Sequence, residues 1–136
     1  MAEEIINRVT SSKLKTFDLE EIYPEGNRVL FDIKDWLFQD LILKEKDFRS
    51  SVIKHDWSQY KNSFVAITCS VEAIIPSWAF MLIAAEAAPF AKKVVVGDLE
   101  LLETVLYQEL LSFVDLKDFT DCPVIILVSQ FIFFFL

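Results

Sequence analysis

Glycine is scarce in this chain of 136 residues, which contains only Gly26 and Gly97. The dinucleotide-binding pattern GxGxxG and the P-loop both need glycines within a few residues of each other, so that the backbone can approach a phosphate. The helix expected after Gly97 also begins with Asp98 and Glu100, whose negative charges would repel a phosphate at that helix end. The sequence therefore excludes the common nucleotide-binding motifs.

Metal ligands of the kind that zinc and iron prefer are also few. The chain has one histidine, His55, and two cysteines, Cys69 and Cys122, which lie far apart in the sequence. It contains no HExxH pattern, no CxxC pattern and no acidic loop of the calcium-binding type. We therefore expect neither a metal site nor a bound cofactor, and a metal site shared between subunits is the alternative.

Basic residues are outnumbered, with 13 Lys and Arg against 21 Asp and Glu and a formal net charge of −8. Phosphate backbones are bound by clustered basic side chains, and Lys92–Lys93 is the only adjacent pair here, so we expect no nucleic-acid partner. The acidic start, Met1–Glu4, lacks the basic and apolar regions of a signal peptide. Together with two unmatched cysteines, this start indicates a reduced, cytoplasmic protein.

The last 14 residues, from Pro123 to Leu136, carry no charge. As a helix they would reach about 21 Å, which is short of the roughly 30 Å hydrocarbon core, so no membrane span is expected. The Phe-rich end, Phe131–Leu136, would be an aggregation hazard as an exposed strand. Two explanations stay open: an early stop or a change of reading frame near Leu127, since thymine-rich codons encode Phe, Ile and Leu, or a swapped or docked final strand.

Short apolar runs alternate with helical stretches in the second half of the chain. The expected order is strand, helix, strand, helix, strand, over Phe64–Cys69, Pro76–Ala88, Lys93–Val96, Asp98–Val114 and Val124–Val128. This order predicts an α/β fold, with a small, mostly parallel sheet of three strands or more and flanking helices in a single domain.

The expected organisation of that single domain, residues 1–136, has four parts. Residues 1–27 form an N-terminal lead-in that ends in a turn at Pro24–Asn27. Residues 28–62 form a strand–helix appendage, residues 63–128 the strand–helix–strand–helix–strand unit, and residues 129–136 an apolar tail, which is either abnormal or a swapped or docked strand.

Parallel strands place their carboxyl ends along one edge of the sheet, where such folds bind ligands. Cys69 and Asp98 are expected at this edge, with Ser70 and Glu100 beside them. Nearby N–H groups would favour the thiolate of Cys69, although a cysteine there also serves simply as packing. Asp98 and Glu100 are more simply explained as helix caps.

His55 is the candidate general base, since a Cys–His pair meets in space and not in sequence. The alternative is a surface histidine near a helix C-terminus, where the helix dipole favours its charged form. Nothing in the sequence places His55 near Cys69, so both interpretations stay open.

The helix expected at Pro76–Ala88 is apolar on nearly all sides, and Glu86 is its only charge. Such a helix must be covered on more than one face. It is therefore either sandwiched inside the domain or used in association, which makes a protein partner or a homo-oligomer plausible.

Several segments resemble a bacterial family known as domain of unknown function 2480. They are Arg28–Trp36, Leu41–Arg49, His55–Tyr60, Val65–Ser70, Pro76–Ala79 and Gly97–Glu100, within residues 1–126. The resemblance implies a source in Bacteroidota. It also implies a link to the pathway of iron–sulfur cluster assembly, because members of the family are often encoded beside proteins of that pathway. Members of this family continue from the last strand into a Gly-Cys segment. This chain has Leu127–Gln130 and then phenylalanines, which puts in doubt any site that depends on later cysteines.

Three functional hypotheses follow. The first is a non-catalytic accessory or interaction protein linked to iron–sulfur cluster assembly or thiol metabolism. The second is a thiol-dependent enzyme or sulfur carrier, in which Cys69 is the nucleophile or sulfur acceptor and His55 the base. The third is an unproductive product of a damaged gene.

Overall fold

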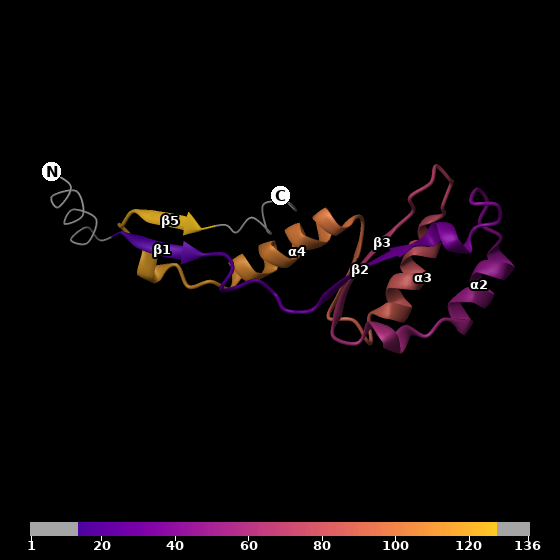
Figure 1. The fold of residues 1–136 in the computed structure, drawn as a ribbon, viewed down its shortest axis with the longest axis horizontal. Helices are drawn as coiled ribbons and strands as arrows, with labels where there is room; N and C mark the ends of the chain where they lie inside the picture. Colours follow the sequence, from indigo (N-terminus) through magenta and orange to yellow (C-terminus); the bar gives the residue numbers. More distant parts are fainter. Residues whose placement is uncertain (1–13, 128–136) are drawn as a thin grey trace. The chain divides into compact units, whose positions relative to one another are not determined.

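The computed structural model describes residues 14–127. Its secondary structure confirms the α/β fold, with parallel strands and three helices (Figure 1). The elements are β1 (Lys15–Asp18), β2 (Asn27–Asp32), η1 (Ile33–Trp36), α2 (Glu45–Lys54), η2 (Trp57–Tyr60), β3 (Ser63–Thr68), α3 (Ser77–Ala87), β4 (Lys93–Val96), α4 (Leu99–Ser112), η3 (Lys117–Phe119) and β5 (Val124–Leu127), where η marks a 3₁₀-helix.

The chain divides into two compact units. The core unit is Glu25–Val105, and the terminal unit combines Met1–Pro24 with Leu106–Leu136. The Phe-rich end lies outside the described residues, and the expectation of a single domain stays a prediction.

The core unit contains a three-stranded sheet in the order β2-β3-β4, and all its strands run parallel. Val65 pairs with Val94 and Ala66 with Val95, as the strand–helix–strand pattern predicts. The expectation of an N-terminal appendage is wrong, because β2 pairs with β3 along its whole length, from Asn27 to Asp32. The strand–helix segment 28–62 is thus an integral part of this sheet.

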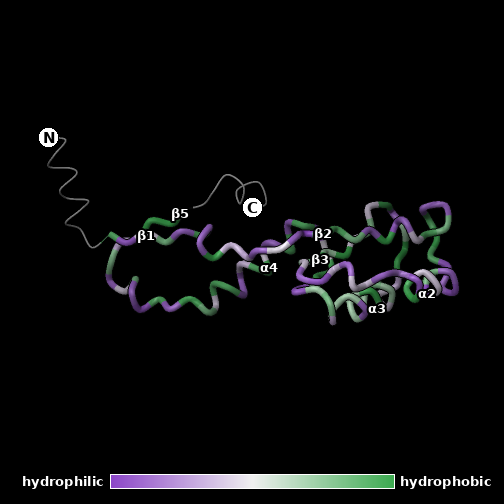
Figure 2. The backbone as a smooth tube through the Cα atoms, turned by 60° about the horizontal axis from the view of Figure 1, so that its bottom comes forward, coloured by the Kyte–Doolittle hydropathy of each residue, from purple (hydrophilic) through white to green (hydrophobic). Residues whose placement is uncertain are grey.

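The expected third strand of that sheet, Val124–Val128, is placed differently. Its described part, β5, pairs in parallel with β1 in the terminal unit. All four of its residues are apolar and exposed, and Figure 2 shows the hydrophobic colour along β5. A continuous apolar run is typical of a buried parallel strand, but the run itself does not specify which strand it pairs with.

Helices α2 and α3 pack on the same face of the core sheet. Phe48 of α2 and Ile83 of α3 are fully buried and belong to one cluster with Phe31, Val65 and Ile67 of the strands. The alternation of side chains along a strand puts Arg28 and Phe64 on the opposite face. Arg28 lies over the Phe64 ring and pairs with Glu103 of α4 at 2.7 Å, so the first turns of α4 cover that second face.

Helix α3 confirms the predicted helix after Pro76, and it is covered mainly on one side. Its buried residues Ala79, Ile83 and Ala87 recur every four positions and face the sheet. Met81 on the outer side is 69% exposed. The helix therefore keeps an apolar outer side in the described chain.

Candidate functional site

The carboxyl ends of the three core strands lie at one edge of the sheet. Asp32 ends β2, Cys69 follows β3, and Gly97 follows β4. The Gly97 N–H donates to the carbonyl of Ile67 at 2.9 Å, which extends the β3–β4 pairing by one residue. This edge therefore positions the segment that carries Cys69 next to the turn that leads into α4.

A hollow of about 310 Å³ opens at this edge. It lies among the ends of β3 and β4, the β3–α3 loop and α3, and its lining residues are Ile67, Thr68, Cys69, Val71, Ala73, Ile75, Phe80, Val96 and Gly97. We call it the edge hollow. Its mixture of apolar side chains with a thiol, a hydroxyl and backbone groups, together with its size, suits a small ligand or one side chain of a partner.

Cys69 is half-buried in the wall of the edge hollow. Its thiol donates to the carbonyl of Val71, with 3.5 Å between sulfur and oxygen, and its side chain packs against the core cluster. The thiol thus contacts both the core and the hollow. A packing role and a chemical role both remain consistent with this position.

Asp32 organises the same edge, and the sequence analysis missed it. Its Oδ1 accepts hydrogen bonds from the backbone N–H of Lys34 at 3.0 Å and of Ser70 at 3.1 Å. Burial alone would raise the pKa of Asp32, but the hydrogen bonds from Ser70 and Lys34 outweigh it and hold that pKa below its ordinary value. An aspartate directly before the helical turn Ile33–Trp36 is a typical N-cap, which was the available signal.

Replacing Asp32 with alanine is expected to loosen the start of the β3–α3 loop, because Ser70 loses the carboxylate that connects it to β2. Losing a cap and a charge-assisted hydrogen bond should cost about 1–2 kcal/mol of unfolding free energy. The urea midpoint measures that loss, and the rate of Cys69 alkylation should rise at the same time. Asp56→Ala is the matched control, because Asp56 caps η2 in the same way but lies away from this loop. Equal alkylation rates in both variants would contradict this role of Asp32.

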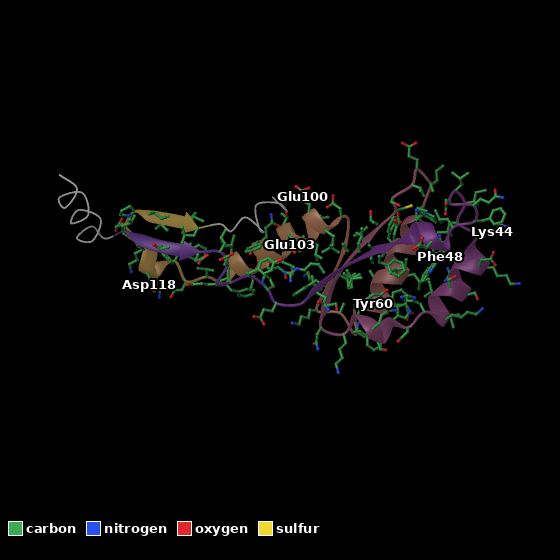
Figure 3. The ribbon with its side chains drawn as sticks, in the orientation of Figure 1. Lys44, Phe48, Tyr60, Glu100, Glu103 and Asp118 are labelled. Atoms are coloured by element: carbon green, nitrogen blue, oxygen red, sulfur yellow. The ribbon has the colours of Figure 1, made fainter. Side chains whose placement is uncertain are left out.

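His55 lies in an aromatic cluster with Phe31, Trp36, Trp57 and Tyr60. Its Nε2 is 2.7 Å from the Tyr60 hydroxyl and 3.2 Å from Nε2 of Gln59 (Tyr60 is labelled in Figure 3). Within residues 14–127, no hydrogen bond joins His55 to Cys69. The pairing of these two residues as base and nucleophile stays a prediction.

Acid is expected to destabilise the protein through His55. Burial lowers the pKa of His55 below 6.5, and the carboxylate of Asp56 offsets this only in part. The unfolded chain then binds the proton more readily than the folded chain, so stability is full above pH 6.5 and falls as the pH drops through the interval between the two pKa values. Urea midpoints measured from pH 8 to pH 5 test this, with His55→Gln as the variant that should lose most of the dependence. An unchanged slope in His55→Gln would refute it.

Asp98 and Glu100 occupy the start of α4, as expected. Asp98 Oδ1 accepts the backbone N–H of Leu101 at 2.8 Å, which is a helix cap. Glu100 is exposed in the first turn (Figure 3). Ser70 is exposed as well, and its backbone contacts Asp32. The helix cap explains why an aspartate stands at position 98. A ligand-binding role of Ser70 and Glu100 stays a prediction.

A second hollow, of about 300 Å³, lies within the terminal unit. All its lining residues are apolar: Phe17, Leu111, Val114, Leu116, Phe119, Val124 and Ile126.

Among the described residues, no three His, Cys, Asp or Glu side chains are grouped to hold a metal ion. Over the same range, no helix is long and apolar enough to cross a membrane.

The core unit places this protein in the α/β class, with a parallel sheet and a hollow at the carboxyl ends of its strands. Within that class, a family model described as "Protein of unknown function (DUF2480)" matches residues 3–130, and the chain belongs to this family. No curated protein and no solved structure matches the chain significantly.

Proposed function

We propose that this protein is a non-catalytic cytoplasmic accessory protein that binds a protein partner at the rim of the edge hollow. The observation that carries the proposal is the exposure of Ile74 in the β3–α3 loop. Val71, Ala73 and Ile75 of this loop line the hollow, whereas Ile74 between them is 95% exposed. An isoleucine exposed so fully at the edge of a hollow is a suitable contact for an apolar partner side chain.

Helix α3 follows this loop directly, lines the hollow through Phe80 and keeps a second apolar side chain, Met81, exposed. Methionine adapts to irregular apolar partners and is common at binding surfaces. The link to iron–sulfur cluster assembly or thiol metabolism, and the source in Bacteroidota, rest on the family resemblance. They indicate in which host the partner should be sought.

Affinity capture from a Bacteroidota extract tests the proposal, with the full chain as bait. Ile74→Glu should lose the captured partner, because a charge at the rim must be desolvated on binding. Ile53→Glu is the matched control: Ile53 is 83% exposed on α2, away from the hollow. Retention of the same partner by Ile74→Glu, or a monomeric protein that captures nothing, would refute the proposal.

A second candidate function is favoured by the position of Cys69 in the wall of the hollow. In this alternative, the protein is a thiol-dependent enzyme or a sulfur carrier. As a carrier, the Cys69 thiolate would attack the outer sulfur of a donor persulfide, the donor thiolate would leave, and Cys69 would carry the sulfane sulfur. His55 would act as the base in the enzymatic version.

Cys69→Ser separates the two functions. The carrier or enzyme loses its nucleophile and cannot complement a deletion of the gene. The accessory protein retains its binding surface and should complement fully, because serine keeps the size of the side chain. Complementation by Cys69→Ser would therefore exclude the thiol function.

A further inference from the structure

We call the hollow of about 300 Å³ in the terminal unit the apolar hollow. Its walls come from β1, from α4 and the segment after it, from η3 and from β5, and all of its lining side chains are apolar. Two of them, Leu116 and Ile126, are 66% and 61% exposed. A buried water molecule needs about two to four polar partners, so this lining favours an apolar occupant over water.

The volume of the apolar hollow indicates the size of that occupant. A cavity of about 150 Å³ lined by Leu, Ile and Phe binds one benzene molecule. The apolar hollow has about 300 Å³, so roughly two aromatic rings fit. Phe17 and Phe119 in its wall contact each other edge to face, with 5.6 Å between the ring centroids. A further ring therefore finds aromatic partners there.

The sequence that follows β5 supplies side chains of this kind. Val124 and Ile126 of β5 line the apolar hollow, and Leu127 is the last residue that the structure describes. Residues 128–130 come next, and then the Phe-rich end, Phe131–Leu136. The Phe-rich end and the lining residues all belong to the terminal unit, so a contact between them lies within one compact unit.

The Phe-rich end is attached close to the apolar hollow. Ile126 lines the hollow, and only residues 127–130 separate it from Phe131. A β-turn reverses the chain within four residues and keeps its first and last Cα atoms within about 7 Å of each other. One turn after β5 therefore lets Phe131 reach the hollow. A short linker gives an attached group an effective concentration in roughly the millimolar range, so weak apolar contacts are enough to hold it.

We propose that the Phe-rich end folds back in the same chain and places one or two of its phenyl rings in the apolar hollow. This occupant matches the hollow in its hydrocarbon character, in the size of its rings and in its attachment to the wall. Burial there also removes the Phe-rich end from solvent, where it would be prone to aggregate as an exposed strand.

Disulfide formation within the full chain tests this contact, with both native cysteines replaced by serine. Leu116→Cys marks the wall of the apolar hollow, and it is combined in turn with Phe131→Cys, Phe133→Cys and Phe135→Cys. In the matched control, Phe113→Cys takes the place of Leu116→Cys, because Phe113 is 86% exposed and does not line the hollow. Under mild oxidation we expect an intrachain disulfide, identified by peptide mass, that forms on the order of tenfold faster at position 116 than at position 113.

Digestion by chymotrypsin, which cleaves after phenylalanine, is the second measurement, and it begins with the wild-type chain. Val114→Trp adds a large side chain at the wall of the apolar hollow and should displace the Phe-rich end. Cleavage within the Phe-rich end should then accelerate on the order of tenfold, because proteolysis follows the population of the accessible form. Phe113→Trp adds the same ring outside the hollow and should be cleaved at the wild-type rate.

Equal rates of disulfide formation at positions 113 and 116 would overturn the inference, as would disulfides that form only between differently tagged chains. Equal cleavage of Val114→Trp and Phe113→Trp would also contradict it. An apolar molecule that co-purifies with the wild type and is lost from Val114→Trp would give the hollow a different occupant, with the same consequence. None of these outcomes depends on partner binding at Ile74, so this contact and the accessory function can fail separately.

Discussion

Glu103→Ala is expected to destabilise the core unit by about 3 kcal/mol, because it leaves the guanidinium of Arg28 without its carboxylate in a largely buried position. Glu103 is 3% exposed, and the Arg28 side chain is 15% exposed. The pair joins β2 to α4 across the second face of the sheet (Figure 3 labels Glu103). Chemical denaturation in urea, monitored by tryptophan fluorescence, measures the loss.

The pair between Arg49 and Glu45 is the matched control. It is also an arginine–glutamate contact, at 3.0 Å, but both side chains are at least half exposed on α2. Exposed pairs of this kind contribute at most about 0.5 kcal/mol, so Glu45→Ala should leave the midpoint nearly unchanged. A joint Arg28→Met, Glu103→Leu variant should recover much of the stability, since it leaves no buried charge. Equal midpoints for Glu103→Ala and Glu45→Ala would contradict this account.

Gly97→Val is the second substitution with a large expected effect. The φ angle of Gly97 is +156°, a conformation that side-chain-bearing residues rarely adopt, and a Cβ atom at this position would collide with Leu101 Cδ2 and lie 3.3 Å from Leu101 Cβ and Cγ. Strain of this kind costs about 1–3 kcal/mol, and the collision adds to it. We expect a urea midpoint well below that of the wild type.

The double variant Gly97→Ala, Leu101→Ala separates the two causes. Removal of the Leu101 side chain relieves the collision but not the backbone strain, so stability relative to Gly97→Ala should recover only in part, after allowance for the cost of Leu101→Ala alone. A Gly97→Val protein as stable as the wild type would show that the turn between β4 and α4 adopts another conformation. The edge hollow, which Gly97 lines, would then have a different shape from the one described.

The elements that the sequence predicted correctly are those with strong local signals. Pro76 and the apolar run after it mark α3, and Asp98 marks the start of α4 as a cap. The parallel pairing of β3 with β4 follows from the short helical connection between them. These features depend on residues close together in the chain, so a single sequence is enough to reveal them.

Pairing between distant segments was predicted less well. The sequence pattern predicts an appendage at β2 because the connection to β3, residues 33–62, contains 3₁₀ turns as well as α2, and these turns obscure the strand–helix–strand order. The apolar composition of β5 predicts a buried strand of the core sheet, whereas β5 pairs with β1. The composition of a strand indicates that it is buried, but it does not indicate which other strand it pairs with.

The candidate site shows the same division. Cys69 and Asp98 follow neighbouring parallel strands, as predicted from the order of elements. Asp32 was missed because its hydrogen bond to Ser70 spans 38 positions in the sequence. The aromatic surroundings of His55 come from β2, η1 and η2, which only the fold brings together.

Alkylation of the native protein by iodoacetamide tests the edge hollow most directly, with peptide mass mapping in a Cys122→Ser background. We predict that Cys69 is modified under conditions in which the protein stays folded, because the hollow opens its thiol to solvent, and that Asp32→Ala accelerates the reaction. If Cys69 reacts only at urea concentrations that unfold the core unit, the thiol is sealed within the core, and the carboxyl edge of the sheet holds no accessible site.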